Sequence, residues 1–144
     1  MNSYKRTGAV ATASGASWAP RTPTYGGNDR THYIRLPDNQ RVEMRGGDAS
    51  ANPYLAVAGA LGAGLDGIAK GGHPGPIGSG PDGELPSTLL EAIDLMLADS
   101  VVCGVLDAAG PGVADYFAEL KRAEFREYHA AVSAWELARY LTAF

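Results

Sequence analysis

The chain has 144 residues, of which 45% are hydrophobic and 19% are charged, as is typical of one ordinary folded domain. No apolar run approaches the roughly 18 residues of a membrane span, and the single cysteine, Cys103, excludes an internal disulfide framework and a zinc site built from several cysteines. Because no charged and apolar leader opens the sequence, we expect a cytoplasmic protein. The 19 glycines and 9 prolines predict that part of the chain is loop.

The charges are unevenly distributed along the chain. Residues 1–50 contain seven basic and four acidic residues, and six of the seven basic ones are arginines, whereas residues 51–144 contain five basic and twelve acidic residues. Arginine suits bidentate contacts with carboxylates and phosphates, so the first segment indicates either a local anionic ligand or a solvated positive face. The overall pI of about 5.3 argues against a nucleic-acid-binding protein, and no nucleic-acid or membrane partner is expected.

The first elements predicted are a long loop and a hairpin. Residues 7–29 are small, polar and rich in glycine, which predicts a loop. Two strands are expected at residues 31–36 and 40–45, joined by a turn at 37–39, so that a hairpin occupies residues 31–45. Alternation places apolar side chains on one hairpin face and charged ones on the other. The apolar face is formed by Ile34, Leu36, Val42 and Met44, and the charged face by Arg35, Arg41, Glu43 and Arg45.

Helices are predicted over most of the remaining chain. Asn52 followed by Pro53 is typical of a helix start, and the segment 52–70 carries no charge before Asp66, so we expect a helix that is buried almost all round. Residues 71–86 read as a glycine–proline loop. A helical tail over 87–144 is expected to contain helices at 88–98 and 99–107 and one helix of about thirty residues after residue 111.

The charged hairpin face carries the most specific chemistry in the sequence. Four arginines and one glutamate lie within sixteen residues, namely Arg30, Arg35, Arg41, Glu43 and Arg45. Such a set fits an anion held between guanidinium groups, with the carboxylate as a ligand for a hard cation that accompanies a phosphate. It equally fits a surface ladder of cross-strand Arg–Glu ion pairs, and spacing alone leaves both readings open.

Several separate motifs lie along the first half of the chain, namely NSYKR at 2–6, NDRTHYIRLP at 28–37, RVEMR at 41–45, ANPYL at 51–55 and AGLDGI at 63–68. In this order and spacing, they resemble the motifs of glutamine synthetase, the ATP-dependent glutamate–ammonia ligase. The tail strings ELKRAEF at 119–125 and SAWE at 133–136 are similar to the third-type branch, which includes ligases for methylamine. The resemblance implies an α+β fold that is a fragment of the glutamine synthetase catalytic domain, with 1–30 as a flap-like loop. In the family, about two thirds of the polypeptide precede this point.

The resemblance also implies a role for each residue of the charged set. By position, Arg30 is similar to a catalytic arginine that contacts the nucleotide phosphates and the acyl phosphate. Arg35 and Arg41 match nucleotide-binding arginines, and Arg6 and Arg45 match arginines that hold the substrate glutamate. Glu43 matches a carboxylate that coordinates Mg²⁺ or Mn²⁺. The implied substrates are ATP, glutamate, and ammonia or a small amine, and the implied partners are further copies of the chain or the preceding part of the enzyme.

Two positions depart from the family pattern. Trp18 stands where the flap usually carries a glutamate, and the short turn at 38–40 has no match for a nucleotide-contacting lysine. The alternatives to a glutamine-forming segment are therefore a ligase for methylamine or another amine, and a non-enzymatic remnant or assembly subunit that binds nucleotide or glutamate. We expect the isolated chain to be inactive. Cys103 and His32 are expected to be packing residues.

Overall fold

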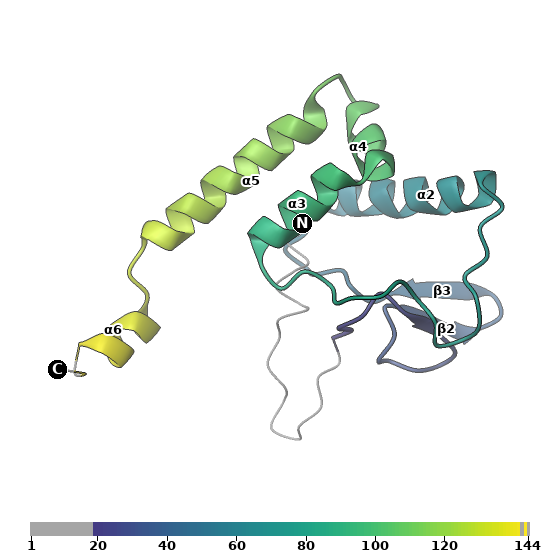
Figure 1. Ribbon diagram of the computed structural model, residues 1–144, viewed down its shortest axis with the longest axis horizontal. Helices are drawn as coiled ribbons and strands as arrows, with labels where there is room; N and C mark the ends of the chain where they lie inside the picture. Colours follow the sequence, from purple (N-terminus) through teal and green to yellow (C-terminus); the bar gives the residue numbers. More distant parts are fainter. Residues whose placement is uncertain (1–18, 142, 144) are drawn as a thin grey trace.

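The computed structural model describes residues 19–141 and 143, and Arg6 and Trp18 lie outside these residues. Within them, a small sheet is followed by a series of helices (Figure 1). The strands are β1 (Tyr25–Gly26), β2 (Ile34–Asp38) and β3 (Arg41–Met44), and the helices are α2 (Pro53–Ala69), α3 (Leu89–Ala98), α4 (Ser100–Asp107), α5 (Val113–Ala130) and α6 (Ala134–Tyr140). The predicted α+β class is confirmed.

The sheet has the order β1-β2-β3, with β1 parallel and β3 antiparallel to β2. The predicted hairpin exists, but its turn lies later than expected. Pro37 belongs to β2, and the connection is made by residues 39–40, where the amide of Gln40 donates to the Asp38 carboxylate at 2.9 Å. The register is irregular between Arg35 and Asp38, as expected of a strand whose proline cannot donate to the ladder.

Strand β1 lies inside the segment that the sequence predicts to be loop. It is held by the glycine–proline loop as well as by β2, because the amide of Tyr25 donates to the Ser79 carbonyl at 3.2 Å and the amide of Gly78 donates to the Tyr25 carbonyl at 2.8 Å. Gly80 is needed for this close approach, since a Cβ there would lie 2.4 Å from the Pro23 carbonyl oxygen. Residues 71–86 thus support the edge of the sheet.

The hydrophobic core is formed by α3, α4 and α5. Ile93 is fully buried, and the other buried members are Leu89, Met96, Leu106, Ala114 and Ala118. The short helices begin at well-formed caps, as Thr88 and Glu91 make a capping box for α3, and Asp99 accepts from two amides at the start of α4. Cys103 is partly buried against this core and donates to the Met96 carbonyl.

The expectation that the helix at 52–70 is buried almost all round is wrong for this structure. Helix α2 begins at the predicted Asn52 cap, but it contains no buried residue. One side packs on α4 through small residues, and a Cβ at Gly62 would lie 2.2 Å from Val105 Cγ2. The opposite side is open, which the apolar composition of the helix could not reveal.

The expectation of a single helix of about thirty residues after residue 111 is also wrong. Helix α5 ends at Ala130, and Ser133 starts α6 with a capping box that it shares with Glu136. Helix α6 lies apart from the other elements, beyond the far end of α5 (Figure 1). In the described part of the chain, no helix is both long and apolar enough to cross a membrane.

Candidate functional site

Glu43 lies at the centre of the charged hairpin face. It is directly opposite Arg35 in the β2–β3 register, and Arg45 follows two residues later on the same face. Arg35 Nη1 donates to Glu43 Oε2 at 2.7 Å, and Arg45 Nε donates to Glu43 Oε1 at 3.1 Å. Each carboxylate oxygen therefore accepts a charge-assisted hydrogen bond from a different guanidinium group.

The three side chains differ in their access to solvent. The side chain of Arg45 is 5% exposed and that of Arg35 is 14% exposed, whereas that of Glu43 is 43% exposed. Partial burial raises the pKa of Glu43, but the charges and hydrogen bonds of Arg35 and Arg45 together hold that pKa below its ordinary value. Glu43 is therefore ionised at neutral pH, and it is the most accessible member of the three.

The loop that precedes β2 also contributes to the site, because it contacts Arg35. Asn28 Oδ1 accepts from Arg35 Nε at 3.0 Å and also from Arg35 Nη2. The pKa of Asp29 is lowered, first by the backbone hydrogen bond from Thr31 and then by the Thr31 hydroxyl, and the charge of Arg45 contributes further. The sequence analysis placed Asn28 and Asp29 in the predicted loop and in the motif at 28–37, but it assigned no role in the site to either residue.

His32 fixes the shape of this loop. Its Nδ1 and the Thr24 hydroxyl lie 2.9 Å apart in a hydrogen bond, and its Nε2 lies 3.9 Å from Asp29 Oδ2. The ring rests on Gly26, where a Cβ would lie only 2.1 Å from His32 Cδ2. The imidazole therefore ties the start of the loop to its end, in agreement with the predicted packing role.

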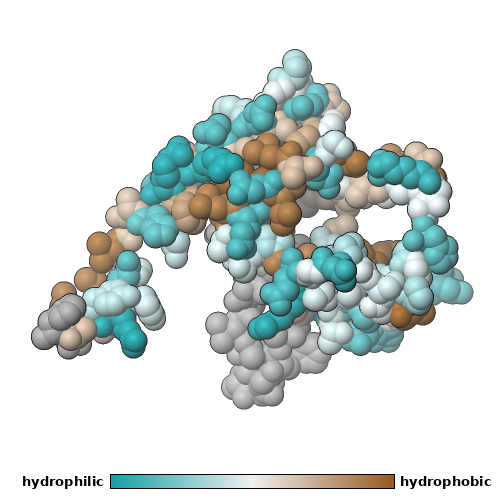
Figure 2. All heavy atoms as spheres, viewed as in Figure 1, coloured by the Kyte–Doolittle hydropathy of each residue, from teal (hydrophilic) through white to brown (hydrophobic). Residues whose placement is uncertain are grey.

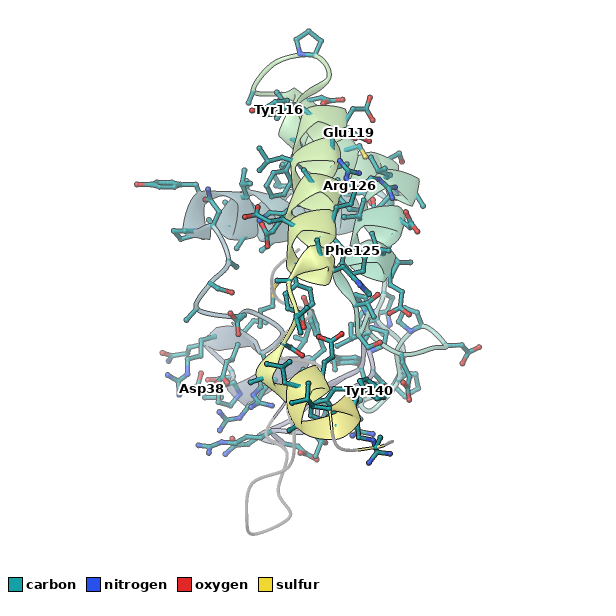
Figure 3. The ribbon with its side chains drawn as sticks, turned by 90° about the vertical axis from the view of Figure 1, so that its left-hand side faces the viewer. Asp38, Tyr116, Glu119, Phe125, Arg126 and Tyr140 are labelled. Carbon is teal, nitrogen blue, oxygen red and sulfur yellow. The ribbon has the colours of Figure 1, made fainter. Side chains whose placement is uncertain are left out.

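Two other predicted residues, Arg30 and Arg41, are exposed. Arg30 is exposed in the loop between Asp29 and Thr31. Arg41 is exposed at the tip of the hairpin, where its Nε lies 3.1 Å from Asp38 Oδ2, and Figure 3 shows Asp38 at this end of the sheet. The structure thus brings together Arg35, Glu43 and Arg45, and it leaves Arg30 and Arg41 exposed.

The described residues do not by themselves form a complete site for a hard cation. Among residues 19–141 and 143, no three metal-ligating side chains come together, and both oxygens of Glu43 are engaged by arginines. Mg²⁺ requires near-octahedral oxygen coordination. Glu43 fits as one ligand of such an ion, and the described residues do not supply the others. The guanidinium groups, by contrast, are suited to bind carboxylates or phosphates.

Comparisons with known proteins agree with this fold. The family described as glutamine synthetase, catalytic domain, matches residues 1–140. A glutamine synthetase of Rhizobium leguminosarum bv. phaseoli is 38% identical over 94% of this chain and 33% of its own length. A glutamate–methylamine ligase of Methyloversatilis universalis is 38% identical over 100% of this chain and 34% of its own length. A solved GmaS/ADP complex, conformation 1, has a TM-score of 0.76 and 38% identity, covering 97% of this chain and 37% of that one.

These observations define an α+β part of a catalytic domain with an arginine-rich hairpin. The chain belongs to the glutamine synthetase family, as the sequence motifs indicated. The branch resemblance is also confirmed, since a glutamate–methylamine ligase is among the relatives. The chain spans about a third of the length of the curated relatives that it matches.

Proposed function

We propose that this chain supplies the C-terminal part of the catalytic domain of a cytoplasmic ligase that joins glutamate to ammonia or a small amine. The reaction uses ATP and passes through a γ-glutamyl phosphate, which the amine attacks with loss of phosphate. The observation that carries this proposal is the ion-paired trio of Arg35 on β2, Glu43 on β3 and Arg45 directly after β3, in a chain from the glutamine synthetase family.

The proposed roles follow from charge and access. Arg30, Arg35 and Arg41 donate to nucleotide phosphate oxygens, and Arg30 also stabilises the negative charge on the transferred phosphoryl group. Arg6 and Arg45 bind substrate carboxylates. Because Arg45 is buried against Glu43, it binds glutamate only after a local rearrangement, or it orients Glu43 instead.

Glu43 is the residue that we propose as a ligand of Mg²⁺ or Mn²⁺, together with oxygen ligands from outside the described residues. Such an ion would offset the phosphate charge when bound. Glu43 can bind such an ion while it keeps its arginine contacts, because each carboxylate oxygen has two lone pairs and accepts one hydrogen bond from Arg35 or Arg45. The side chain is 43% exposed, which leaves the carboxylate accessible to the ion.

Assembly without catalysis is the second candidate function. The chain spans only about a third of its curated relatives, and the described residues hold one proposed metal carboxylate. The isolated chain is therefore expected to be inactive and to act within an oligomer or together with the preceding part of the enzyme.

A fusion polypeptide tests the proposed function. The part of the Methyloversatilis relative that precedes the match is joined to residues 1–144, and the product is supplied with ATP, glutamate, Mg²⁺ and either ammonium or methylamine. Formation of glutamine or γ-glutamylmethylamide supports the ligase function, and the preferred amine identifies the branch. A folded fusion that forms neither product would favour the non-enzymatic alternative.

A further inference from the structure

Asn28 holds one edge of the Arg35 guanidinium group. Its amide oxygen accepts from Arg35 Nε at 3.0 Å and also from Arg35 Nη2. A further hydrogen bond of this guanidinium group runs from Nη1 to Glu43 Oε2 at 2.7 Å. Arg35 is therefore held from two sides, by a neutral amide of the loop and by a carboxylate of β3.

The backbone of the loop keeps Asn28 beside Arg35. The Gly27 carbonyl accepts from the Asp29 amide at 2.8 Å, which places Asn28 at the centre of a three-residue turn. The same carbonyl accepts from the amide of Leu36, the residue that follows Arg35 on β2, at 3.2 Å. The turn is thus fastened to β2 next to Arg35, and the position of the Asn28 amide oxygen follows from it.

The remaining donors of Arg35 suit an anion. Each terminal nitrogen of a guanidinium group carries a pair of N–H bonds, and within the described residues Nη1 and Nη2 each make a single hydrogen bond. Because Asn28 occupies the edge that Nε and Nη2 share, the second N–H of Nη2 lies on the side of Nη1. The side chain of Arg35 is 14% exposed, and Figure 2 shows hydrophilic residues over much of the layer that contains the sheet.

The chemistry of the amide explains what Asn28 adds. Arginine and a carboxylate favour a bidentate pair with two parallel N–H···O bonds, and the Nε–Nη2 edge of Arg35 is one that could form such a pair with Glu43. Asn28 occupies this edge, so Glu43 receives only Nη1. An amide oxygen carries no net charge, so it lowers the attraction of the guanidinium group for a second anion less than another carboxylate would.

We propose that Asn28 is a positioning residue of the ligase, which keeps Arg35 out of a bidentate pair with Glu43 and presents its remaining N–H groups to a nucleotide phosphate. The inference rests on the proposed function, because it concerns the same ATP-dependent reaction. In this role Asn28 does not touch the substrate and acts through Arg35. Its removal should therefore matter only where Arg35 is present.

Solvent exchange of the Arg35 Nε–H tests the contact with Asn28. The exchange rate is measured by NMR in the 144-residue chain, for the parent, Asn28→Ala and the control Glu119→Ala, which truncates an exposed side chain on α5 (Figure 3). We expect the rate to rise by at least about tenfold in Asn28→Ala, because the Nε–H loses its acceptor, and to stay unchanged in the control. Equal rates in the parent and Asn28→Ala would overturn the inference.

A double-mutant cycle in the fusion polypeptide tests the effect on the nucleotide. Asn28→Ala is combined with Arg35→Lys, which keeps the positive charge but lacks the planar set of N–H donors. Calorimetric titration of ATP measures the affinity of each variant. We expect Asn28→Ala to weaken ATP binding by about tenfold in the parent, and by about twofold or less beside Arg35→Lys. The melting temperature should change little, since Asn28 is exposed.

The outcomes separate this inference from the proposed function. Unchanged ATP binding in Asn28→Ala would overturn the inference in a ligase that still functions, as would equal losses with Arg35 and with Arg35→Lys. A folded parent fusion that binds no ATP would refute the proposed function, and the inference would fall with it. Faster Nε–H exchange, together with a loss of ATP binding that depends on Arg35, would support the positioning role.

Discussion

Arg35 and Glu43 lie directly opposite each other on β2 and β3, and their side chains are joined by a hydrogen-bonded ion pair of 2.7 Å. Arg45 completes the arrangement from the other carboxylate oxygen at 3.1 Å. The structure therefore contains the ion-pair ladder that the spacing permits, and under the proposed function the same arginines would bind an anionic substrate. Guanidinium groups that would otherwise repel one another are neutralised by one carboxylate until a ligand competes for them.

Replacing the central carboxylate should destabilise the chain. In Glu43→Gln, the buried Arg45 and the largely buried Arg35 lose their shared counter-charge, and breaking such a pair leaves buried charge uncompensated. We expect a lower melting temperature than in the parent. The control is Glu119→Gln, whose side chain is exposed and 3.9 Å from Arg122. Equal melting temperatures for both variants would show that the trio adds no stability.

The same carboxylate makes stability depend on pH. The pKa of Glu43 is lower in the folded chain than its ordinary value, so the stabilisation is present above the ordinary glutamate pKa and is lost as pH falls through the folded pKa. The melting difference between the parent and Glu43→Gln should therefore be largest near neutral pH and shrink on acidification. The cap residues Glu91 and Glu136 also have lowered pKa values, from Ser87 and Ser133 amides respectively, and remain in both proteins. A difference that grows at acid pH would contradict this assignment.

Two neighbouring glycines offer a matched test of the loop. Gly26→Ala would drive a methyl group into the His32 ring, whereas Gly27→Ala meets no atom within 4 Å. Only Gly26→Ala should displace the imidazole from Thr24 and loosen the loop that carries Arg30. Hydrogen exchange of residues 24–33 should then increase in Gly26→Ala and stay unchanged in Gly27→Ala. Equal exchange in both variants would show that His32 does not hold the loop.

The stability of the helical core should depend strongly on the side chain of Ile93. Ile93 is fully buried among α3, α4 and α5, whereas Leu95 on the same helix is exposed. Ile93→Ala is expected to lower the free energy of unfolding by about 2–5 kcal/mol, because it removes methyl groups and leaves a cavity. Leu95→Ala should change it by about 0.5 kcal/mol or less. Denaturant unfolding measures both, and a similar loss in the two variants would mean that the core is placed incorrectly.

The local parts of the fold were predictable, because their signals lie close together in sequence. The Asn52–Pro53 start of α2, the short helix at 99–107 and the charged hairpin face all follow from adjacent residues. The break between α5 and α6 could also have been predicted, since Ser133 and Glu136 have the spacing of a capping box. It was missed because the apolar pattern continues across the break.

Features that depend on distant segments were not predictable. Strand β1 has two residues and depends on loop 71–86 for part of its hydrogen bonding. The alternation of strand side chains assigned Arg45 to the correct face of the hairpin, but it gave no indication that this side chain is buried. The exposure of α2 was hidden for a related reason: an apolar helix has the same sequence whether this chain or another polypeptide covers it.

A substitution at Arg30 should change ligand binding without changing the stability of the fold. It is exposed, so its removal should leave the melting temperature unchanged, whereas removal of the buried Arg45 alters both stability and binding. In the fusion polypeptide, Arg30→Ala should weaken ATP binding by about one to two decades, since a charge-assisted hydrogen bond contributes about 1.5–3 kcal/mol. Arg126→Ala, which removes an exposed arginine from α5 (Figure 3), is the charge-matched control and should bind ATP like the parent. Calorimetric titration of ATP against the three proteins measures the difference. If Arg30→Ala binds ATP as tightly as Arg126→Ala, then Arg30 does not contact the nucleotide.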